Sequence, residues 1–390
     1  MENLDQQFNK DTNLENFTNL NLRSLDALRG FLAIYVLLGH CRWLLWAGNS
    51  QWNLHSHPWW ANLFAYASSS LRYGHEVVMI FFVLSGFFIH LRVAKQLAFL
   101  NKTKIKFDLI NFFKRRCHRL IPPYIFALFL TVIFDLFGNF FYSTLYIGLT
   151  GDTLLDLNFQ RKGFSLTSII PAMLMLPTSL GRDFGTNGPL WSLAYEVVYY
   201  MIYPLWLIVR RLGIVPAYGL GIFLAIVAGY YSLDDGFFKA VLIHYPIWLS
   251  GALIAEVFTS TKINKNHIFT GLIFLIFSVL TVQIKLPLIF LILNYLILGS
   301  SVVIIVLGLP KSIYHNKFHN FFELIGIESY TIYICHFPII TLISAWSIDV
   351  LGGRPLHGWL VIGGAIITLL TTHLCFLVCE RHFLHQRLKN

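Results

Sequence analysis

The stretch Leu28-Arg-Gly-Phe-Leu-Ala-Ile-Tyr-Val-Leu-Leu-Gly-His40 decides the fold, because it belongs to an apolar run long enough to cross a bilayer. Arg29 and His40 lie eleven residues apart in it. Eleven helical steps of about 100° return to within about 20° of the starting direction, so both side chains share one face, about 16 Å apart along the axis. Ionisable side chains inside a membrane are costly and usually mark a functional path. Arg29 and His40 are therefore the first candidates for chemistry.

The composition of the whole chain agrees with a membrane protein. Of 390 residues, 56% are hydrophobic and 12% are charged, whereas a soluble domain carries about a quarter charged residues. The mean hydropathy is +0.64. The sequence predicts an all-α membrane protein, a polytopic bundle of about ten transmembrane helices near residues 28–47, 74–93, 120–140, 189–209, 213–232, 238–258, 267–284, 286–308, 326–346 and 357–379.

The formal charge of +10 follows from membrane topology. Alternate connections between the ten segments carry 21 of the 29 Lys and Arg residues, and the other side carries 8. Because Lys and Arg are enriched in cytoplasmic loops, both termini are predicted to be cytoplasmic. The sequence therefore predicts a membrane-lipid environment and no nucleic-acid partner.

The ends of the chain differ in composition from its middle. Residues 1–25 are Asn-rich, and they contain neither a basic start nor an apolar core of the kind found in a cleavable signal peptide. We expect a flexible or interfacial cytoplasmic tail over 1–25, a transmembrane domain over 26–384 and a cytoplasmic tail over 385–390. The five cysteines show no metal-like spacing with histidines, so no metal site is predicted.

A long basic connection precedes the third apolar segment. Residues 92–119 hold nine Lys or Arg residues, among which Arg115, Arg116 and Arg119 cluster at helical spacing. One interpretation is a belt that contacts anionic lipids and fixes the topology. The other is a phosphate site, because three guanidinium groups at a helix start can bind several phosphate oxygens.

Two connections on the opposite side carry further signals. Residues 165–177 are apolar, too short to span, and contain Pro171 and Pro177, which is typical of a re-entrant or interfacial helix. Residues 48–73 contain three tryptophans and two histidines, which either anchor the headgroup zone or stack against a sugar. These residues are Trp52, Trp59, Trp60, His55 and His57.

Polar residues also interrupt the apolar segments themselves. Ser85 and Gly86 form a small-residue pair where helices can pack closely. Ser192, Glu196, Tyr199 and Tyr203 share one stripe of a later segment, and Glu196 is either functional or paired with a cation such as Arg72 or Arg182. Ser329, Tyr333 and His336 share a face of the ninth segment. A lone buried histidine is usually structural, but two histidines and a glutamate in different segments favour a site.

Together these motifs resemble the acyltransferase-3 family of integral membrane O-acyltransferases, which modify cell-surface sugars. The matching elements run in the family's order over residues 23–385: Arg29-Gly30-x-x-Ala33 with His40, Phe81-Phe-Val-Leu-Ser85-Gly86-Phe, Arg115-Arg116-x-x-Arg119-Leu-x-Pro-x-Tyr124, Trp191-Ser-Leu-x-x-Glu196-x-x-Tyr199 with Pro204, Ser329-Tyr-x-x-Tyr333-x-x-His336-x-Pro338, and Glu380-Arg381. Two features depart from the pattern. Val77-Val78-Met79 replaces a frequent Gly-Val-Asp, so that the role of the acid is missing or falls to Glu76, and no appended hydrolase-like domain is seen, as in the family's short form.

The resemblance implies the substrates. The donor would be acyl-coenzyme A, most often acetyl-CoA, entering from the cytoplasm as a substrate, with no bound cofactor. The acceptor would be a hydroxyl of a cell-surface glycan, such as a polysaccharide or lipopolysaccharide, or of a lipid-linked saccharide. The expected location is the inner (plasma) membrane of a bacterium, as a multi-pass protein. Coenzyme A carries three phosphate groups, and the residues expected to bind it are Arg29, Arg92, Arg115, Arg116 and Arg119.

The resemblance also implies roles at the reacting centre. We expect His40 to act as general base on the acceptor hydroxyl, a role typically worth 10²–10⁴-fold in rate. Glu196 would orient or charge-stabilise His40 or bind sugar hydroxyls, and His336 would polarise the carbonyl or steer the acceptor. An acyl-His40 intermediate is the open alternative. The residues expected to bind substrate are Ser85, Trp191, Tyr199 and Tyr333.

Two other classes of protein remain as alternatives. A proton-coupled transporter of a small solute would also hold buried His and Glu residues, but the sequence shows no repeats or paired broken helices. A membrane sensor or structural subunit would use the same residues only to join helices. Acyl-CoA binding or turnover separates the enzyme from both.

Overall fold

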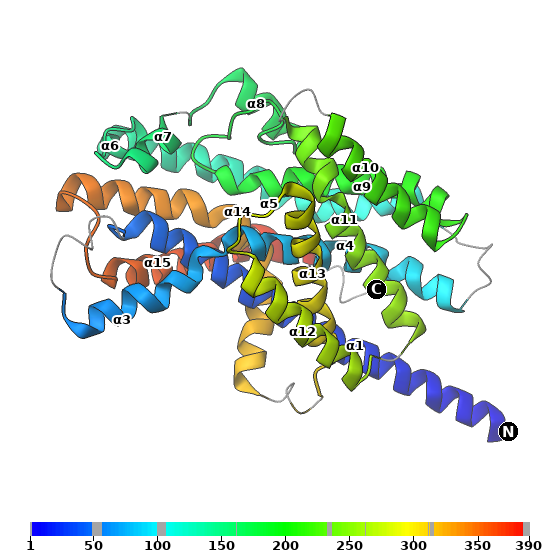
Figure 1. Ribbon diagram of the computed structural model, residues 1–390. Helices are drawn as coiled ribbons and strands as arrows, with labels where there is room; N and C mark the ends of the chain where they lie inside the picture. The colour runs from blue at the N-terminus through cyan, green and yellow to red at the C-terminus, as the bar shows by residue number, and fades with distance from the viewer. Residues whose placement is uncertain are drawn as a thin grey trace.

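Helices form nearly all of the chain in this computed structural model, which describes residues 2–48, 57–99, 107–160, 162–231, 236–261, 263–310, 312 and 316–384 (Figure 1). These ranges contain no strand. The long helices are α1 (Glu2–Leu45), α4 (Gly74–Phe99), α5 (Leu109–Phe141), α9 (Trp191–Arg210), α10 (Ile214–Tyr231), α11 (Phe237–Ser260), α12 (Lys265–Thr281), α13 (Leu288–Leu307), α14 (Lys317–Leu351) and α15 (Trp359–Cys375). The shorter ones are α3 (Trp59–Ser68), η1 (Ser69–Arg72), α6 (Ser143–Tyr146), α7 (Thr153–Phe159), α8 (Leu166–Met173), η2 (Gly188–Leu190), a π-helical turn (Phe376–Glu380) and α16 (Arg381–Leu384).

The all-α polytopic architecture predicted from the sequence is confirmed, with one correction to the number of spans. Within the described residues, eight helices are long and apolar enough to cross a membrane. The predicted segments near 213–232 and 267–284 form apolar helices over Ile214–Tyr230 and Lys265–Thr281, which are shorter. A helix of 17 residues is about 25 Å long, against a hydrocarbon core of about 30 Å.

Helix α1 extends further toward the N-terminus than its apolar part. Its backbone is helical from Glu2, so residues 2–25 continue into the first span without a break. The domain boundary at residue 25 stays a prediction. Trp52, His55 and residues 385–390 lie outside the described residues.

The pairing of α1 with α14 depends on two glycines that face each other's helix backbone. A Cβ atom on Gly30 would lie 2.0 Å from the carbonyl oxygen of Phe322, and one on Gly326 would lie 1.9 Å from that of Asp26. Only hydrogen atoms fit at these distances, as in the small-residue contacts of membrane helices. This close approach brings the helices that carry His40 and His336 together.

A second glycine pair joins α4 to α11. A Cβ atom on Gly86 would lie 1.9 Å from the carbonyl oxygen of Trp248, and one on Gly251 would lie 1.9 Å from that of Val83. The close helix contact predicted from Ser85-Gly86 is therefore confirmed. Ser85 itself accepts a hydrogen bond from the Trp248 indole at 3.2 Å.

A buried polar network connects α4, α9 and α11. The guanidinium of Arg210 donates to both carboxylate oxygens of Glu256, at 2.8 and 2.5 Å. The His90 ring lies 3.0 Å from Glu256 Oε1 and 2.9 Å from the Tyr203 hydroxyl. Because each charged group has a partner, the network can remain buried and holds these three helices in register.

Helices α6 and α7 lie at one end of the bundle, beside the end of α14, and α8 lies further toward the middle of the molecule (Figure 1). Asp135 of α5 anchors the segment between α5 and α9 by accepting hydrogen bonds from the Thr186 backbone N–H and hydroxyl, both at 2.7 Å. The predicted interfacial helix corresponds to α8, a two-turn helix containing Pro171 with exposed Leu166 and Met173. Its depth in a membrane stays a prediction.

Candidate active site

Two cavities meet inside the bundle. The larger, of about 1270 Å³, is called here the arginine cavity, and its charged lining residues are Asp26, Arg29, Arg92, Lys95, Asp108, Arg115, Arg116, Arg119, Glu196 and Arg211. The smaller, of about 320 Å³, is called the histidine cavity, and it is lined by Val36, His40, Trp43, Gly74, His75, Val78, Asn158, Lys162, Asp183, Gly188, Pro189, Trp191, Tyr333 and Phe337. Val78 and Tyr333 line both cavities, so they form the wall between them.

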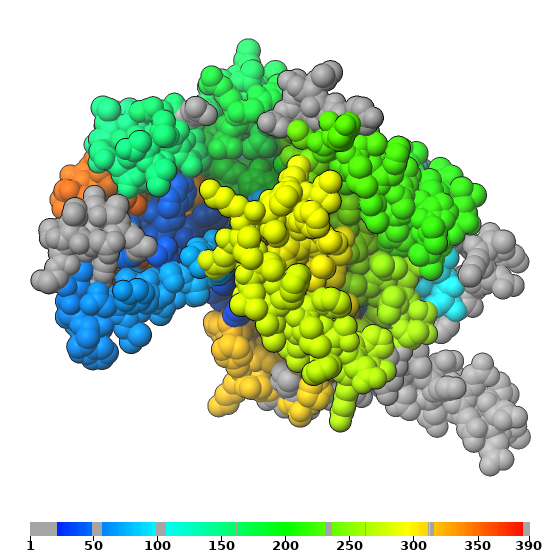
Figure 2. Space-filling model, viewed as in Figure 1, coloured from blue at the N-terminus to red at the C-terminus, as the bar shows by residue number. Residues whose placement is uncertain are grey.

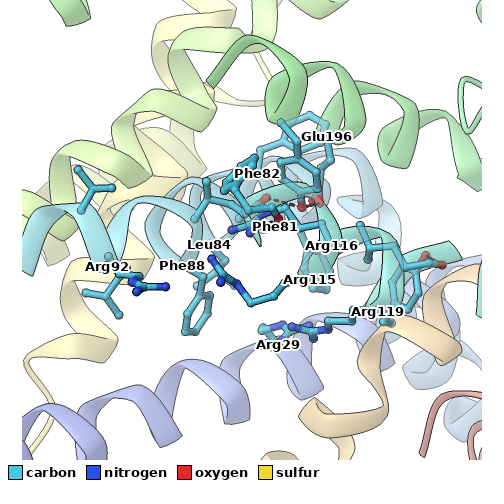
Figure 3. Close-up of a pocket in the computed structure, with 18 of the residues that line it drawn as sticks. Arg29, Phe81, Phe82, Leu84, Phe88, Arg92, Arg115, Arg116, Arg119 and Glu196 are labelled. Atoms are coloured by element: carbon cyan, nitrogen blue, oxygen red, sulfur yellow. Dashed lines mark hydrogen bonds between the residues drawn. The ribbon is translucent and has the colours of Figure 1, made fainter. Parts of the chain in front are cut away.

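All five arginines predicted to bind the donor line the arginine cavity. Figure 3 shows Arg29 from α1, Arg92 from α4 and the three arginines of α5 around one space. Helix α5 places its arginines because Asp108 caps its first turn by accepting from the Asn111 N–H at 3.0 Å. Spacings of three and four residues then put Arg115, Arg116 and Arg119 on neighbouring positions of one turn.

Two of these guanidinium groups contain buried donors without a partner. Nε of Arg116 and Nε of Arg119 are both buried, and neither has a hydrogen-bond partner among the described residues. Arg116 also packs its guanidinium over the Phe112 ring at 3.7 Å, which holds it in place. Buried, unsatisfied cationic donors are expensive, so this cavity suits an anion with several oxygens.

Glu196 lies in the arginine cavity rather than beside His40. Its Oε2 accepts a hydrogen bond from the Tyr200 hydroxyl at 2.7 Å, and the Ser85 hydroxyl lies 3.2 Å from the same Tyr200 oxygen. Among the described residues neither suggested partner, Arg72 or Arg182, forms an ion pair with Glu196, and the guanidinium of Arg72 donates to the Tyr73 hydroxyl instead. The sequence could not tell which cavity Glu196 faces, because that depends on which helices are neighbours.

His40 and His336 form a direct pair between α1 and α14. Nδ1 of His40 lies 2.8 Å from Nε2 of His336. Nδ1–H of His336 donates to the carbonyl oxygens of Ile332 at 3.0 Å and Tyr333 at 2.8 Å. Because carbonyls only accept, the hydrogen of a neutral His336 is on Nδ1, and its Nε2 accepts from Nδ1–H of His40. This network leaves Nε2 of His40 with an unprotonated lone pair.

Tyr333 is held at the wall between the cavities by hydrogen bonds to the start of α9. Its hydroxyl donates to the Pro189 carbonyl at 3.1 Å, and the Ser192 hydroxyl lies 2.6 Å from it. Pro189 follows Gly188 in the short turn η2 that leads into α9. The wall is therefore built from Tyr333 of α14 and Val78 of α4, and the residues around the start of α9 hold Tyr333 in place.

The sequence missed several residues of the histidine cavity. Lys162, Asp183 and Asn158 line it, but all three come from the connection between α5 and α9, which carries no helical periodicity to place them. One signal was present, because Arg161 and Lys162 are basic residues on the side that the Lys and Arg bias leaves poor in charge. His75 also lines this cavity, stacked on Trp191 with ring centroids 5.6 Å apart.

The remaining predicted residues divide between the two cavities and the core. Ser85 lines the arginine cavity and Trp191 the histidine cavity. Tyr199 is buried and lines neither, and its hydroxyl donates to the Val241 carbonyl of α11 at 2.9 Å. Glu76 also lines neither cavity.

One side of the surface is hollowed beside the elements that line the histidine cavity. Figure 2 shows this hollow between the α3–η1 segment, the segment of α6 and α7, and the α12–α13 pair, with atoms of α1 at its floor. His40 belongs to α1 and Asn158 to α7, so lining elements of the histidine cavity border the hollow.

Comparison with known proteins identifies the family. A family profile described as an acyltransferase domain matches residues 22–380. The O-acetyltransferase OatA of Staphylococcus aureus is 24% identical over 371 residues, covering 87% of this chain and 54% of that protein. The peptidoglycan O-acetyltransferase OatA of Listeria monocytogenes is 28% identical over 309 residues, covering 68% of this chain and 44% of that protein.

The chain thus spans about half the length of the curated relatives it matches. No solved structure matches it. The matched region begins at the first apolar turn of α1 and ends at Glu380, the last residue of the π-helical turn. It therefore includes every residue that lines the two cavities. This chain therefore belongs to the acyltransferase-3 family of integral membrane O-acyltransferases.

Proposed function

We propose that the protein transfers an acyl group, most often acetyl, from acyl-coenzyme A to a hydroxyl of a cell-envelope glycan in a bacterial inner membrane. One observation carries the proposal: an arginine-rich cavity and a histidine-containing cavity meet at Tyr333. A negatively charged donor and a hydroxyl acceptor can then approach the same point from opposite sides. The relatives named as O-acetyltransferases support this reaction class.

The arginine cavity is the proposed donor site. Coenzyme A brings three phosphate groups, which match the charge of the five predicted arginines and would satisfy the orphaned Nε donors of Arg116 and Arg119. A volume of about 1270 Å³ exceeds the usual range of small-molecule sites and suits a long cofactor-like substrate. Glu196 lines this cavity, so its proposed role is to accept hydrogen bonds from amide N–H groups of the pantetheine arm.

His40 is the proposed general base. Its Nε2 lone pair takes the proton of the acceptor hydroxyl while the hydroxyl oxygen attacks the thioester carbonyl carbon. The carbonyl π electrons move to oxygen, and when the C=O bond re-forms, the C–S bond breaks. The thiolate then takes the proton from His40. His336 is a positioning residue, since it holds the tautomer and orientation of His40.

The histidine cavity is the proposed acceptor site. Trp191 offers an aromatic surface there, and Asn158 and Asp183 offer groups that bind hydroxyls. The Listeria relative is a protein named as a peptidoglycan O-acetyltransferase, which supports a cell-wall glycan as acceptor. A route through an acyl-His40 intermediate uses the same residues, and isolation of a labelled protein in single-turnover experiments separates it from direct transfer.

Mass spectrometry of envelope glycans tests the proposal. Cells expressing the chain are compared with cells expressing His40→Ala and His373→Ala at equal membrane abundance. His373 is the matched control, because it pairs with Glu328 on the surface and lines neither cavity. We expect an added acyl mass on one glycan, retained in His373→Ala and lost in His40→Ala. If the glycans stay unchanged although the folded protein is abundant, and the protein turns over no acetyl-CoA, the proposal is wrong and a transporter is favoured.

A further inference from the structure

The histidine cavity contains a buried cation that the proposed reaction has not yet used. The side chain of Lys162 is 7% exposed, and it lines the cavity together with His40. It follows α7, in the connection between α5 and α9. Burying an ammonium group costs several kcal/mol unless its partners compensate, so its position calls for an explanation.

The contacts of Lys162 hold its ammonium in place and leave its charge partly uncompensated. Nζ donates to the Thr186 carbonyl at 3.0 Å and lies 3.5 Å from Oδ2 of Asp183. A separation of 3.5 Å is long for a charge-assisted hydrogen bond, which is usually 2.7–2.9 Å, and the Asp183 side chain is 31% exposed. An ammonium has three N–H donors, and these two contacts are with oxygens on one short segment. Burial lowers the pKa of Lys162, and the charges of Asp183 and, more weakly, Asp135 oppose that shift without cancelling it.

The same ammonium lies close to the proposed base. Nζ of Lys162 is 5.0 Å from the centroid of the Phe337 ring. The imidazole of His40 packs edge-to-face on this ring, with centroids 5.0 Å apart. Lys162 and His40 therefore both contact Phe337 and share a cavity near the lower limit of small-molecule sites. The ammonium and the imidazole therefore face the same small cavity beside Phe337.

The backbone next to Lys162 is shaped to leave room for it. A Cβ atom on Gly188 would lie 3.1 Å from Nζ of Lys162 and 3.3 Å from Oδ2 of Asp183. Contacts this short are tighter than most that a Cβ atom makes, so with any larger residue the ammonium or the carboxylate would have to shift by a few tenths of an ångström. Gly188 precedes Pro189, whose carbonyl holds Tyr333. The turn η2 thus positions both the wall between the cavities and the cation beside it.

Attack on a thioester places negative charge on the carbonyl oxygen, and that charge must be stabilised in a site shielded from water. We propose that Lys162 donates a hydrogen bond to this oxygen during acyl transfer and stabilises its charge. The proposal rests on the function proposed above. In the step, His40 holds the acceptor proton while the C–O bond forms, Lys162 bonds the oxyanion without giving up its proton, and collapse releases the thiolate, which takes the proton from His40.

Steady-state kinetics of the purified full chain in nanodiscs test this role, with acetyl-CoA as donor and envelope glycans of the expressing cells as acceptor. Lys162→Met keeps the apolar stem but removes the charge. We expect kcat to fall about 10²–10³-fold, the cost of losing one oxyanion donor. The KM for acetyl-CoA should stay unchanged, because the donor phosphates bind in the other cavity. Lys265→Met, on an exposed residue that lines neither cavity, is the control.

Rescue by small amines separates catalysis from a structural role. In Lys162→Ala, added propylamine should restore kcat at least tenfold and saturably, since its ammonium can occupy the vacated space. Asp183→Asn should lose less activity than Lys162→Met, because the ammonium remains. Full activity of Lys162→Met, or equal losses in Lys162→Met and Asp183→Asn with no amine rescue, would overturn the inference. If His40→Ala is inactive while Lys162→Met is fully active, only the inference fails; if wild-type protein turns over no acetyl-CoA, the proposed function fails and the inference with it.

Discussion

At the scale of single residues, the chemistry depends on which side chains meet across helices. The sequence predicted that Arg29 and His40 share one helix face and that His336 is a site residue. It could not show that His40 pairs with His336 rather than Glu196, because that depends on which helices are neighbours. Nor could it find Lys162, since the connection between α5 and α9 has no periodicity from which positions can be read. The tautomer of His40 follows only from the hydrogen bonds of His336.

The His336 side chain offers a direct test of tautomer control. His336→Phe removes the acceptor for Nδ1–H of His40, so that the proton can move to Nε2 and disable the base. We expect kcat to fall by at least about 10²-fold, within the range that general-base catalysis contributes. His336→Gln, whose amide oxygen can still accept, should retain more activity. The measurement is kcat at constant folded protein, and equal activity of wild type and His336→Phe would remove His336 from the mechanism.

The arginines should act on donor affinity rather than on the rate of chemistry. Arg119→Gln removes one charged donor from the arginine cavity, and a hydrogen bond to a charged group is worth about 1.5–3 kcal/mol. We therefore expect the Kd for acetyl-CoA to rise about tenfold or more, measured by equilibrium binding. Lys114→Gln is the matched control, because Lys114 is exposed on the same helix and lines neither cavity. Equal losses in both variants would indicate a general charge effect.

At the scale of helices, close contacts at glycines determine which helices are neighbours, and therefore where the site residues lie, more than the apolar composition of each helix does. The apolar segments and the Ser85-Gly86 contact could be predicted from the sequence, because both depend on local patterns. The approach of α1 to α14 through Gly30 and Gly326 could not, since it requires knowledge of the partner helix. The buried ion pair of Arg210 and Glu256 was missed for the same reason.

Gly326 tests whether this helix contact supports the histidine pair. Gly326→Ala places a methyl group 1.9 Å from the Asp26 carbonyl oxygen, so α1 and α14 must move apart. We expect a loss of stability of about 1–3 kcal/mol, as for other overpacked sites, with reduced activity. Gly363→Ala on α15 should change little, because a Cβ there meets nothing within 4 Å. Thermal unfolding in detergent measures the difference, and an unchanged midpoint in Gly326→Ala would contradict it.

Removing one partner of the buried charge network should strongly lower the stability of the fold. Glu256→Ala leaves Arg210 buried without its carboxylate, and removal of one partner of a buried pair typically costs about 3–5 kcal/mol. Glu256 lines neither cavity, so the activity per folded molecule should be retained. Unfolding and kcat measured on the same preparation test both parts, and a folded but inactive variant would contradict the structural role.

At the scale of the whole molecule, the two cavities lie at different levels of the bundle. The arginine cavity lies beside the first turns of α5, and the histidine cavity lies beside the segment between α5 and α9. The bias of Lys and Arg predicts that the first faces the cytoplasm. The clustering of the arginines that line the arginine cavity was therefore largely predictable from charge, whereas the histidine cavity depends on connections whose fold the sequence pattern does not specify.

This arrangement predicts a sidedness that vesicles can measure. Acetyl-CoA supplied to inside-out membrane vesicles should support transfer, whereas acetyl-CoA supplied only to right-side-out vesicles should not, because it cannot cross the bilayer. Detergent should abolish the difference by opening both faces. Transfer from either side without detergent would contradict the predicted orientation.

The wall formed by Tyr333 and Val78 has a consequence for the order of events. In the proposed reaction each substrate occupies its own cavity, so neither has to leave before the other binds, and neither competes for the other's contacts. Initial rates measured against both concentrations should give intersecting double-reciprocal plots, as for a ternary complex. The proposed reaction requires only the few atoms of the acyl group to cross the wall, so the thiol product is expected to depart through the opening by which the thioester arrived.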